Sequence, residues 1–175
     1  MSSRSDDIVV VPVETVEELW RCAGLLPGDP KTTVDYVLGA VFRGGGLIAA
    51  AIVGETTAGL IWGTRCQDPD TIYIPYIFVA PEARGQGLYS RLMARLFESG
   101  RQAGFRYAFG LADPDNAASN KGMLRSGFHL IHKGRKFYYP DAEGFFYFID
   151  LVDPRNGDPP RDSSFWRTIM MLEPL

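Results

Sequence analysis

A glycine-rich turn stands between an apolar run and the most regular amphipathic stretch of the chain. The turn contains Gly85 and Gly87, and the amphipathic stretch follows it from Gly87 to Gly100. Glycine lets the backbone approach a ligand closely, and the first amides of a helix have no partner within the helix. These amides lie at the positive end of the helix dipole and attract anions. The turn is therefore a candidate phosphate-binding site, although such turns equally often serve only to connect a strand to a helix.

Two common nucleotide-binding motifs do not fit this turn. A dinucleotide fingerprint that starts at Gly85 needs a third glycine at position 90, which is Ser90. The P-loop motif, G-x-x-x-x-G-K-[ST], occurs nowhere in the chain.

A second polar cluster opens the predicted helix Asn116–Ser126. Asn116 stands at its start, and Ser119 follows one helical turn later. Asparagine at such a position is most often an N-cap, so a structural role and a ligand contact both remain open for Asn116.

Both segments resemble the motifs of the GCN5-related N-acetyltransferase (GNAT) superfamily. The family's acetyl-CoA motif, [QR]-x-x-G-x-[GA], fits Arg84–Tyr89 except that Tyr89 replaces the small last residue. A downstream family pattern, N-x-x-[AS]-x-x-L-Y-x-x-x-G-F, matches in register at Asn116, Ser119, Gly127 and Phe128, and has Met123 in place of its tyrosine. The resemblance extends over about Ile8–Val152.

The resemblance implies that acetyl-CoA is the acyl donor. Its pantetheine arm would lie between the strands Thr71–Val79 and Phe105–Leu111, and Pro75 would suit the splaying of this pair. A backbone N–H near Phe78 or Val79 would polarise the thioester carbonyl. The implied cofactor-binding residues are Ile77, Phe78, Val79, Arg84, Gly85, Gln86, Gly87, Leu88, Tyr89, Ser90, Asn116 and Ser119. Tyr89 also continues the apolar stripe of its helix, which favours a position in the core.

The catalytic acid and base are less clearly marked. Met123 cannot donate a proton, so Ser119 or a bound water is the candidate acid that protonates the leaving thiolate. Tyr73 occupies the strand position at which some family members carry a glutamate base. The alternative bases are Asp70, His129, His132 and a chain of water molecules.

The expected function is transfer of an acetyl group from acetyl-CoA to a primary amine of a small molecule or peptide by direct attack. The alternative is a noncatalytic module of the same fold that binds acyl-CoA as a sensor or interaction surface. Aromatic residues are dense in Phe128–Phe148 and could form either a sheet core or the wall of an acceptor pocket, with the core favoured.

The elements that would position these residues alternate between strands and helices. We expect an α/β fold with a mixed, mostly antiparallel central sheet of about seven strands, a splayed parallel pair and flanking helices. The expected strands are Ile8–Val13, Leu47–Val53, Gly59–Thr64, Thr71–Val79, Phe105–Leu111, Phe128–Tyr139 and Gly144–Val152. The expected helices are Val16–Leu26, Val34–Phe42, Gly87–Gly100 and Asn116–Ser126. Turns are expected at Gly54–Ala58 and Pro140–Glu143.

The 175 residues suit one domain, residues 1–175, with residues 1–7 flexible and residues 153–175 as a C-terminal extension. Within that extension, the apolar segment Phe165–Leu172 is compatible with capping the sheet or with a homodimer interface.

Composition narrows the classes of partner and location. A net charge of -3 and a pI near 5.4 argue against dedicated nucleic-acid or anionic-membrane binding. The longest apolar run, Leu47–Val53, is far shorter than the roughly 20 residues that span a bilayer. We therefore expect a cytoplasmic protein.

Cysteine and histidine content argues against a disulfide framework and a metal site. Cys22 and Cys66 are expected to be reduced thiols. His129 and His132 lie in an alternating stretch in which their side chains are expected to face opposite sides of a strand.

Overall fold

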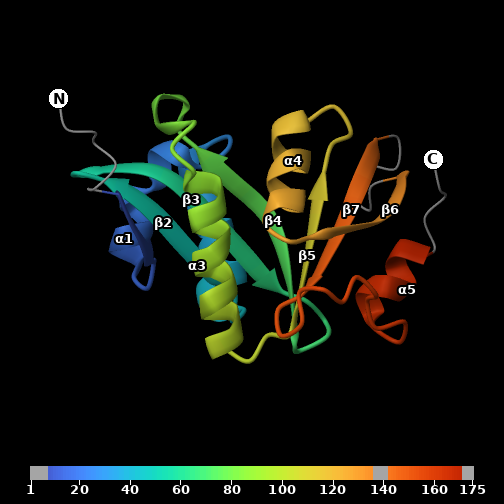
Figure 1. Cartoon of the computed structure of the whole chain (residues 1–175). Coiled ribbons are helices and arrows are strands. Elements are labelled where there is room, and N and C mark those ends of the chain that lie inside the picture. The colour runs from blue at the N-terminus through green and yellow to red at the C-terminus, as the bar shows by residue number, and fades with distance from the viewer. Residues whose placement is uncertain (1–7, 136–141, 171–175) are drawn as a thin grey trace. The chain divides into compact units, whose positions relative to one another are not determined.

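The computed structural model of the chain describes residues 8–135 and 142–170 (Figure 1). The strands are β1 (Ile8–Pro12), β2 (Leu47–Val53), β3 (Thr56–Arg65), β4 (Thr71–Val79), β5 (Tyr107–Ala112), β6 (His129–Arg135) and β7 (Glu143–Asp150). The helices are α1 (Val16–Arg21), α2 (Pro30–Val37), α3 (Leu88–Gln102), α4 (Ala117–Arg125) and α5 (Ser164–Met170). Shorter or irregular helical segments are η1 (Ala23–Leu25), η2 (Leu38–Arg43) and η3 (Pro81–Ala83).

The seven strands form one mixed sheet in the order β1-β2-β3-β4-β5-β7-β6, with β4 and β5 parallel. This arrangement confirms the predicted fold class. The chain divides into two compact units, and β4 contributes to both. The first unit contains the residues up to Thr64 together with Tyr76–Ser99, and the second contains Arg65–Pro75 and the residues from Gly100 onward.

In the first unit, β2 and β3 form the predicted hairpin with a tighter turn than expected. Only Gly54 and Glu55 form the turn, and β3 begins at Thr56 rather than at Gly59. Gly54 adopts a positive φ of 60°, as two-residue hairpin turns require. Because the turn is so short, Thr56 and Thr57 pair with Val53 and Ile52 instead of forming a loop.

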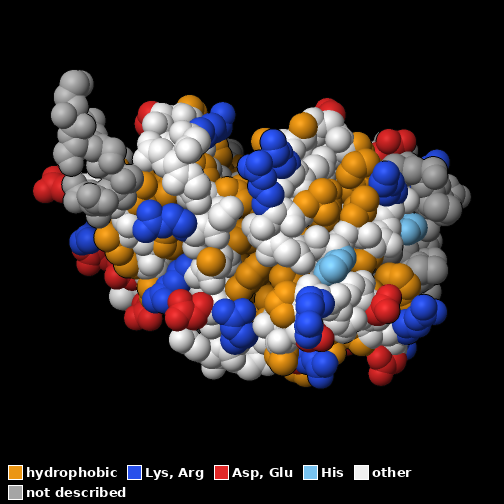
Figure 2. All heavy atoms as spheres, viewed as in Figure 1, with side chains coloured by type: hydrophobic (Ala, Val, Ile, Leu, Met, Phe, Trp, Pro, Cys, Tyr) orange, Lys and Arg blue, Asp and Glu red, His pale blue; other side chains and the backbone are white. Residues whose placement is uncertain are grey.

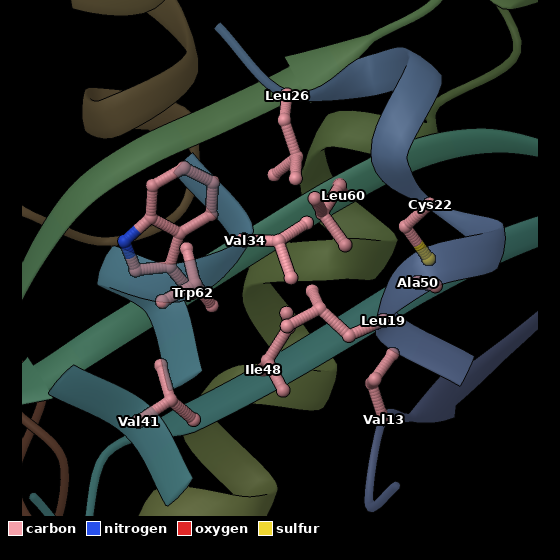
Figure 3. Packing of buried hydrophobic residues seen from close by; sticks show 11 residues of the cluster. Val13, Leu19, Cys22, Leu26, Val34, Val41, Ile48, Ala50, Leu60 and Trp62 are labelled. Carbon is pink, nitrogen blue, oxygen red and sulfur yellow. The ribbon is translucent and has the colours of Figure 1, made fainter. Parts of the chain in front are cut away.

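Helices cover both faces of the sheet in the first unit. On one face, residues of α1, α2 and η2 pack against Ile48, Ala50, Leu60 and Trp62 (Figure 3). On the other face lies α3, which crosses in front of β2 and β3 in Figure 1. Gly59 allows this close approach, because a Cβ atom at its position would lie 2.9 Å from the Cδ1 atom of Leu92.

The first helices are capped by side chains. Thr15 and Glu18 form a capping box at α1, and the carboxylate of Asp29 accepts a hydrogen bond from the Thr32 amide at α2. The predicted helix Val34–Phe42 begins earlier than expected, since Pro30 occupies the first turn of α2, where proline is well tolerated. Its continuation, η2, is a π-helix.

In the second unit, the parallel pairing joins Thr71–Ile74 to Tyr107–Gly110, and the register does not include Pro75. A proline cannot donate to a strand ladder, which explains why the pairing ends there. Helix α4 covers one face, where the Cε atom of Met123 occupies the space that a side chain at Gly110 would need. Helix α5 covers the other face, with Phe165 and Phe109 ring centroids 3.6 Å apart.

The expectation that His129 and His132 face opposite sides is wrong. A bulge between Leu130 and His132 adds one residue to β6, so His129 pairs with Phe148 and His132 with Phe146. Because Phe146 and Phe148 share one face of β7, the two histidines share that face as well. Residues 136–141 of the predicted strand Phe128–Tyr139 and turn Pro140–Glu143 lie outside the described residues.

Two further features concern metals and membranes. Within residues 8–135 and 142–170, no group of three or more His, Cys, Asp or Glu side chains is arranged to hold a metal ion. None of the helices in these ranges has the length and apolarity that a bilayer crossing requires.

Candidate active site

The glycine-rich turn in the first unit joins β4 to α3 through η3. The Ala80 amide donates to the Ala58 carbonyl at 2.9 Å and anchors the end of β4. Gly85 and Gly87 have φ values of 79° and 74°, a conformation that other residues rarely adopt. A Cβ atom at either position would meet no atom within 4 Å. Both glycines are therefore set by backbone conformation rather than by packing, and the space beside them is open.

The start of α3 leaves its first amides without a side-chain cap from the preceding residue. Gly87 stands immediately before Leu88, the first helical residue, and has no side chain that could accept a hydrogen bond. The Arg91 amide donates to the Gly87 carbonyl at 3.2 Å, which closes the first turn. The amides of Leu88, Tyr89 and Ser90 precede this first intrahelical bond, and amides at such a position can donate hydrogen bonds to an anion.

Arg84 precedes these amides in the same turn and has an exposed side chain. Its Nε donates to the Val79 carbonyl at 3.2 Å, which ties the side chain to the end of β4. A guanidinium has five N–H donors, so further donors remain to contact an anion. On the face that carries α3, Lys and Arg side chains lie among Asp and Glu side chains (Figure 2). Anion binding on this face therefore depends on local donors rather than on a broad positive surface.

The remaining predicted cofactor residues of the first unit lie next to the turn. Ile77, Phe78 and Val79 are half-buried on β4, Gln86 is exposed, and Leu88 is buried. Tyr89 is half-buried, and its hydroxyl oxygen has no solvent exposure, so the tip of the side chain points inward.

A stack of aromatic rings on β3 and β4 was not singled out from the sequence. The centroids of Trp62 and Tyr76 lie 4.4 Å apart, and those of Tyr76 and Phe78 lie 6.3 Å apart. The Tyr76 hydroxyl donates to the Leu25 carbonyl at 2.7 Å. Burial raises the pKa of Tyr76, so the phenol remains protonated in this bond. Alternation along β4 places Tyr76 and Phe78 on one face, but only the pairing of β3 with β4 brings Trp62 to them.

In the second unit, Asn116 is the N-cap of α4. Its Oδ1 accepts a hydrogen bond from the Ser119 amide at 3.0 Å. Asn120 extends this arrangement, because its Nδ2 donates to the carbonyls of Asp113 at 2.8 Å and Pro114 at 3.3 Å. The structural role left open for Asn116 is thus observed.

The hydroxyl of Tyr147 completes the network by donating to Oδ1 of Asn120 at 2.7 Å. Tyr147 is only 1% exposed, and burial raises its pKa. The sequence does not mark Asn120 or Tyr147 as partners, because no local pattern links residues so distant along the chain. Phe146, Tyr147 and Phe148 are all buried, as the core interpretation of this aromatic run predicts.

The two predicted catalytic residues face opposite sides of the second unit's sheet. Ser119 is half-buried on α4, whose neighbour Met123 packs against Gly110. Tyr73 pairs with Phe109, which is next to Gly110 on β5 and therefore points to the face covered by α5.

The alternative bases, Asp70, His129 and His132, differ in the contacts that they make. Oδ1 of Asp70 accepts a hydrogen bond from the Thr71 hydroxyl at 3.2 Å, and Nε2 of His129 lies 2.9 Å from the Pro154 carbonyl oxygen. His132 packs against Phe146, and burial lowers the pKa of this imidazole. Of the predicted set, the structure thus brings Ile77–Val79 and Arg84–Ser90 together in the first unit, and Tyr73, Asn116 and Ser119 belong to the second.

Comparisons with known proteins agree with this architecture. A model of the acetyltransferase (GNAT) family matches residues 13–128. No curated protein matches the chain.

Three solved structures illustrate the shared fold. An N-acetyltransferase from Staphylococcus aureus is 20% identical, with a TM-score of 0.68, over 83% of this chain and 99% of that one. A Salmonella typhimurium protein described as an acetyltransferase, with its cofactor acetyl-CoA, is 15% identical, with a TM-score of 0.70, over 89% and 100%. A ribosomal-protein-alanine N-acetyltransferase from Brucella melitensis is 18% identical, with a TM-score of 0.67, over 81% and 99%. Since the family model spans well over half of its residues, the chain belongs to the GNAT family of acetyltransferases.

Proposed function

We propose that the protein transfers an acetyl group from acetyl-CoA to the primary amine of a small molecule or peptide. The observation that carries this proposal is the turn at Gly85 and Gly87, which is open and followed by a helix without a side-chain cap from its preceding residue. Membership of the acetyltransferase family supports the reaction type. The related fold described with acetyl-CoA supports the identity of the donor.

The turn fits the pyrophosphate of acetyl-CoA. The amides of Gln86–Ser90 would donate to its oxygens, and Arg84 would add a charged donor. A side chain at Gly85 or Gly87 would enter the open space and strain the backbone. Ile77, Phe78 and Val79 are half-buried, which suits contact with the pantetheine arm.

Acetyl-CoA supplies an activated acyl group when bound. The nitrogen of the neutral amine attacks the thioester carbonyl carbon, a C–N bond forms, and the C–S bond breaks with its electron pair going to sulfur. The amine loses one proton and the sulfur gains one, so the products are an amide and a free thiol. A backbone N–H near Phe78 or Val79 would stabilise the developing oxyanion, and holding both substrates in place supplies much of the acceleration.

Two residues of the second unit are candidates for the proton transfers. We assign Ser119 as the proton donor to the leaving sulfur and Tyr73 as the group that accepts the proton from the amine. A thiol has a pKa of only about 8.5, so the thiolate leaves readily even though Met123 replaces the family's tyrosine.

Calorimetric titration with acetyl-CoA tests the donor site. We expect micromolar binding by the unmodified protein and at least a roughly 100-fold loss in Gly87→Glu, which adds bulk and negative charge at the turn. Gly28→Glu is the matched control, because Gly28 also has a positive φ of 70° and a Cβ atom at its position would likewise meet no atom within 4 Å. No binding by the unmodified protein, or equal losses in both variants, would contradict the proposed site.

Thiol release with a panel of amines tests the transfer itself. We expect acetyl-CoA to be consumed in stoichiometric proportion to one or more acetylated amines. Tight binding of acetyl-CoA without thiol release by any acceptor would favour the noncatalytic acyl-CoA module instead.

A further inference from the structure

Trp62 has a buried polar group that the fold leaves without a partner. The residue is only 3% exposed, and its indole Nε1 finds no hydrogen-bond acceptor among the described residues. An indole nitrogen can only donate, and a buried donor without an acceptor is costly to the fold. Figure 3 shows Nε1 on the side of the ring that faces away from Val34, Leu60 and Ile48. The donor is thus directed out of the apolar cluster rather than into it.

The rings beside Trp62 form a fixed and partly accessible surface. Tyr76 is stacked on Trp62 with an interplanar angle of 26°, and Phe78 is nearly parallel to Tyr76 at 10°. Both Tyr76 and Phe78 are half-buried, in contrast to Trp62. The hydrogen bond from Tyr76 to the Leu25 carbonyl holds the middle ring in place. A flat apolar group can therefore contact the exposed parts of Tyr76 and Phe78.

An irregular helix lies against the same cluster. The segment η2 (Leu38–Arg43) is a π-helix, and its residues Leu38 and Phe42 are partly buried against the cluster. π-Helical turns are rare and occur frequently at functional sites. This observation is independent of the orphan indole and points to the same region of the first unit.

The chemistry of the cluster restricts what the indole can bind. Its other members are apolar side chains and the thiol of Cys22, whose pKa is raised by burial so that it stays neutral. None of these described members is cationic, so a carboxylate buried among them would be strongly disfavoured. A neutral carbonyl or hydroxyl oxygen would satisfy the indole N–H without that penalty.

We propose that Trp62, Tyr76 and Phe78 form the acceptor subsite, where a flat apolar part of the amine contacts Tyr76 and Phe78 and a neutral oxygen accepts a hydrogen bond from Nε1 of Trp62. The inference rests on the proposed acetyltransferase function and narrows its substrate class. The preferred acceptors are apolar, aromatic primary amines that carry an uncharged oxygen. Trp62 is thus a specificity-determining residue.

A matched pair of amines tests this specificity. Glycine anilide and N-phenylethylenediamine both carry a primary amine and a phenyl ring, and differ in that a carbonyl replaces a methylene. We expect the kcat/KM ratio of the first to the second to fall about tenfold in Trp62→Phe, which keeps an aromatic ring and loses the N–H. Trp20→Phe is the control, because Trp20 is 46% exposed and should leave the ratio unchanged. Differences in amine basicity cancel in this comparison.

A spectroscopic measurement on the unmodified protein does not depend on the variant's folding or on turnover. The indole N–H signals of the three tryptophans are followed by NMR during titration with each amine, with and without coenzyme A. We expect glycine anilide to move the Trp62 proton downfield and N-phenylethylenediamine to leave it in place, with Trp20 unaffected by both. A Trp62 signal unmoved by both amines, or a substrate ratio that Trp62→Phe leaves intact, would overturn the subsite. Failure of acetyl-CoA to bind would instead overturn the proposed function.

Discussion

Helices α3 and α4 both follow a strand and a short turn, yet their N-termini are completed in opposite ways. At α4, the side chain of Asn116 accepts a hydrogen bond from the Ser119 amide. At α3, the preceding residue is Gly87, which offers no side chain. The first amides of a helix need acceptors from outside the helix; the Asn116 side chain supplies one at α4, whereas Gly87 cannot supply one at α3.

The surroundings of the two N-termini reinforce this difference. The turn before α4 is tied down by Asn120, which contacts two carbonyls and the Tyr147 hydroxyl. The turn before α3 is built from two left-handed glycines with open space beside them and one exposed arginine, Arg84. We therefore expect the anionic donor to bind at α3, and the cap at α4 to fix the helix that carries Ser119.

The largest effect is expected at the open N-terminus. Arg84→Ala should weaken acetyl-CoA binding roughly 10- to 100-fold, because it removes charge-assisted hydrogen bonds worth about 1.5–3 kcal/mol. Stability should hardly change, since Arg84 is exposed and its one described contact is with the Val79 carbonyl. Calorimetry at low and high salt, together with thermal unfolding, measures both quantities.

Arg21→Ala is the matched control for Arg84→Ala. Arg21 is exposed and belongs to a surface ion pair with Glu17, so its loss should leave acetyl-CoA affinity unchanged. Unchanged affinity in Arg84→Ala itself would mean that the backbone amides of α3 bind the donor without help from this side chain.

A smaller effect is expected at the closed N-terminus. Asn116→Ala should lower the free energy of unfolding by about 1 kcal/mol through loss of the cap, whereas Asn116→Asp should preserve it. If Asn116 acts only as a cap, Asn116→Asp should bind acetyl-CoA within about threefold of the unmodified protein, and we expect this result from calorimetry. A much larger loss of acetyl-CoA affinity in the aspartate variant would support the contact between Asn116 and the cofactor that the family pattern implies, since a carboxylate there would repel the anionic donor.

The contrast also shows which features a sequence can predict. The bounds of β4, Thr71–Val79, were predicted correctly, and the glycine turn before α3 was recognised, because both depend on residues adjacent in the chain. The Asn116 cap was identified as one of two alternatives for the same reason. Local pattern and local structure coincide in these segments.

The features that were missed depend on residues far apart or on a single inserted residue. The Trp62–Tyr76 stack and the Tyr147–Asn120 bond exist only after the strands have paired and α4 has docked. The bulge in β6 reverses the facing of His132, and nothing in the alternation around Ile131 indicates it. Tertiary pairing decides these features, so periodicity alone could not predict them.

The smallest effect compares two closed caps of different chemistry, Asp29 at α2 and Asn116 at α4. Hydrogen bonds from the Thr32 amide and hydroxyl hold the pKa of Asp29 below its ordinary value of 3.8. A carboxylate whose folded pKa is lowered stabilises the fold fully above its unfolded pKa, and the contribution is lost as pH falls through the folded pKa. The Thr32 amide shift should therefore titrate with a midpoint below 3.8, and Asp29→Asn should abolish that titration while keeping a cap. The Ser119 amide, capped by a group that does not ionise, should keep its hydrogen bond through the same acid range.

A Thr32 midpoint at or above 3.8 would mean that the carboxylate is not held by these donors in solution. The Asp29 cap would then stabilise α2 less than the Asn116 cap stabilises α4.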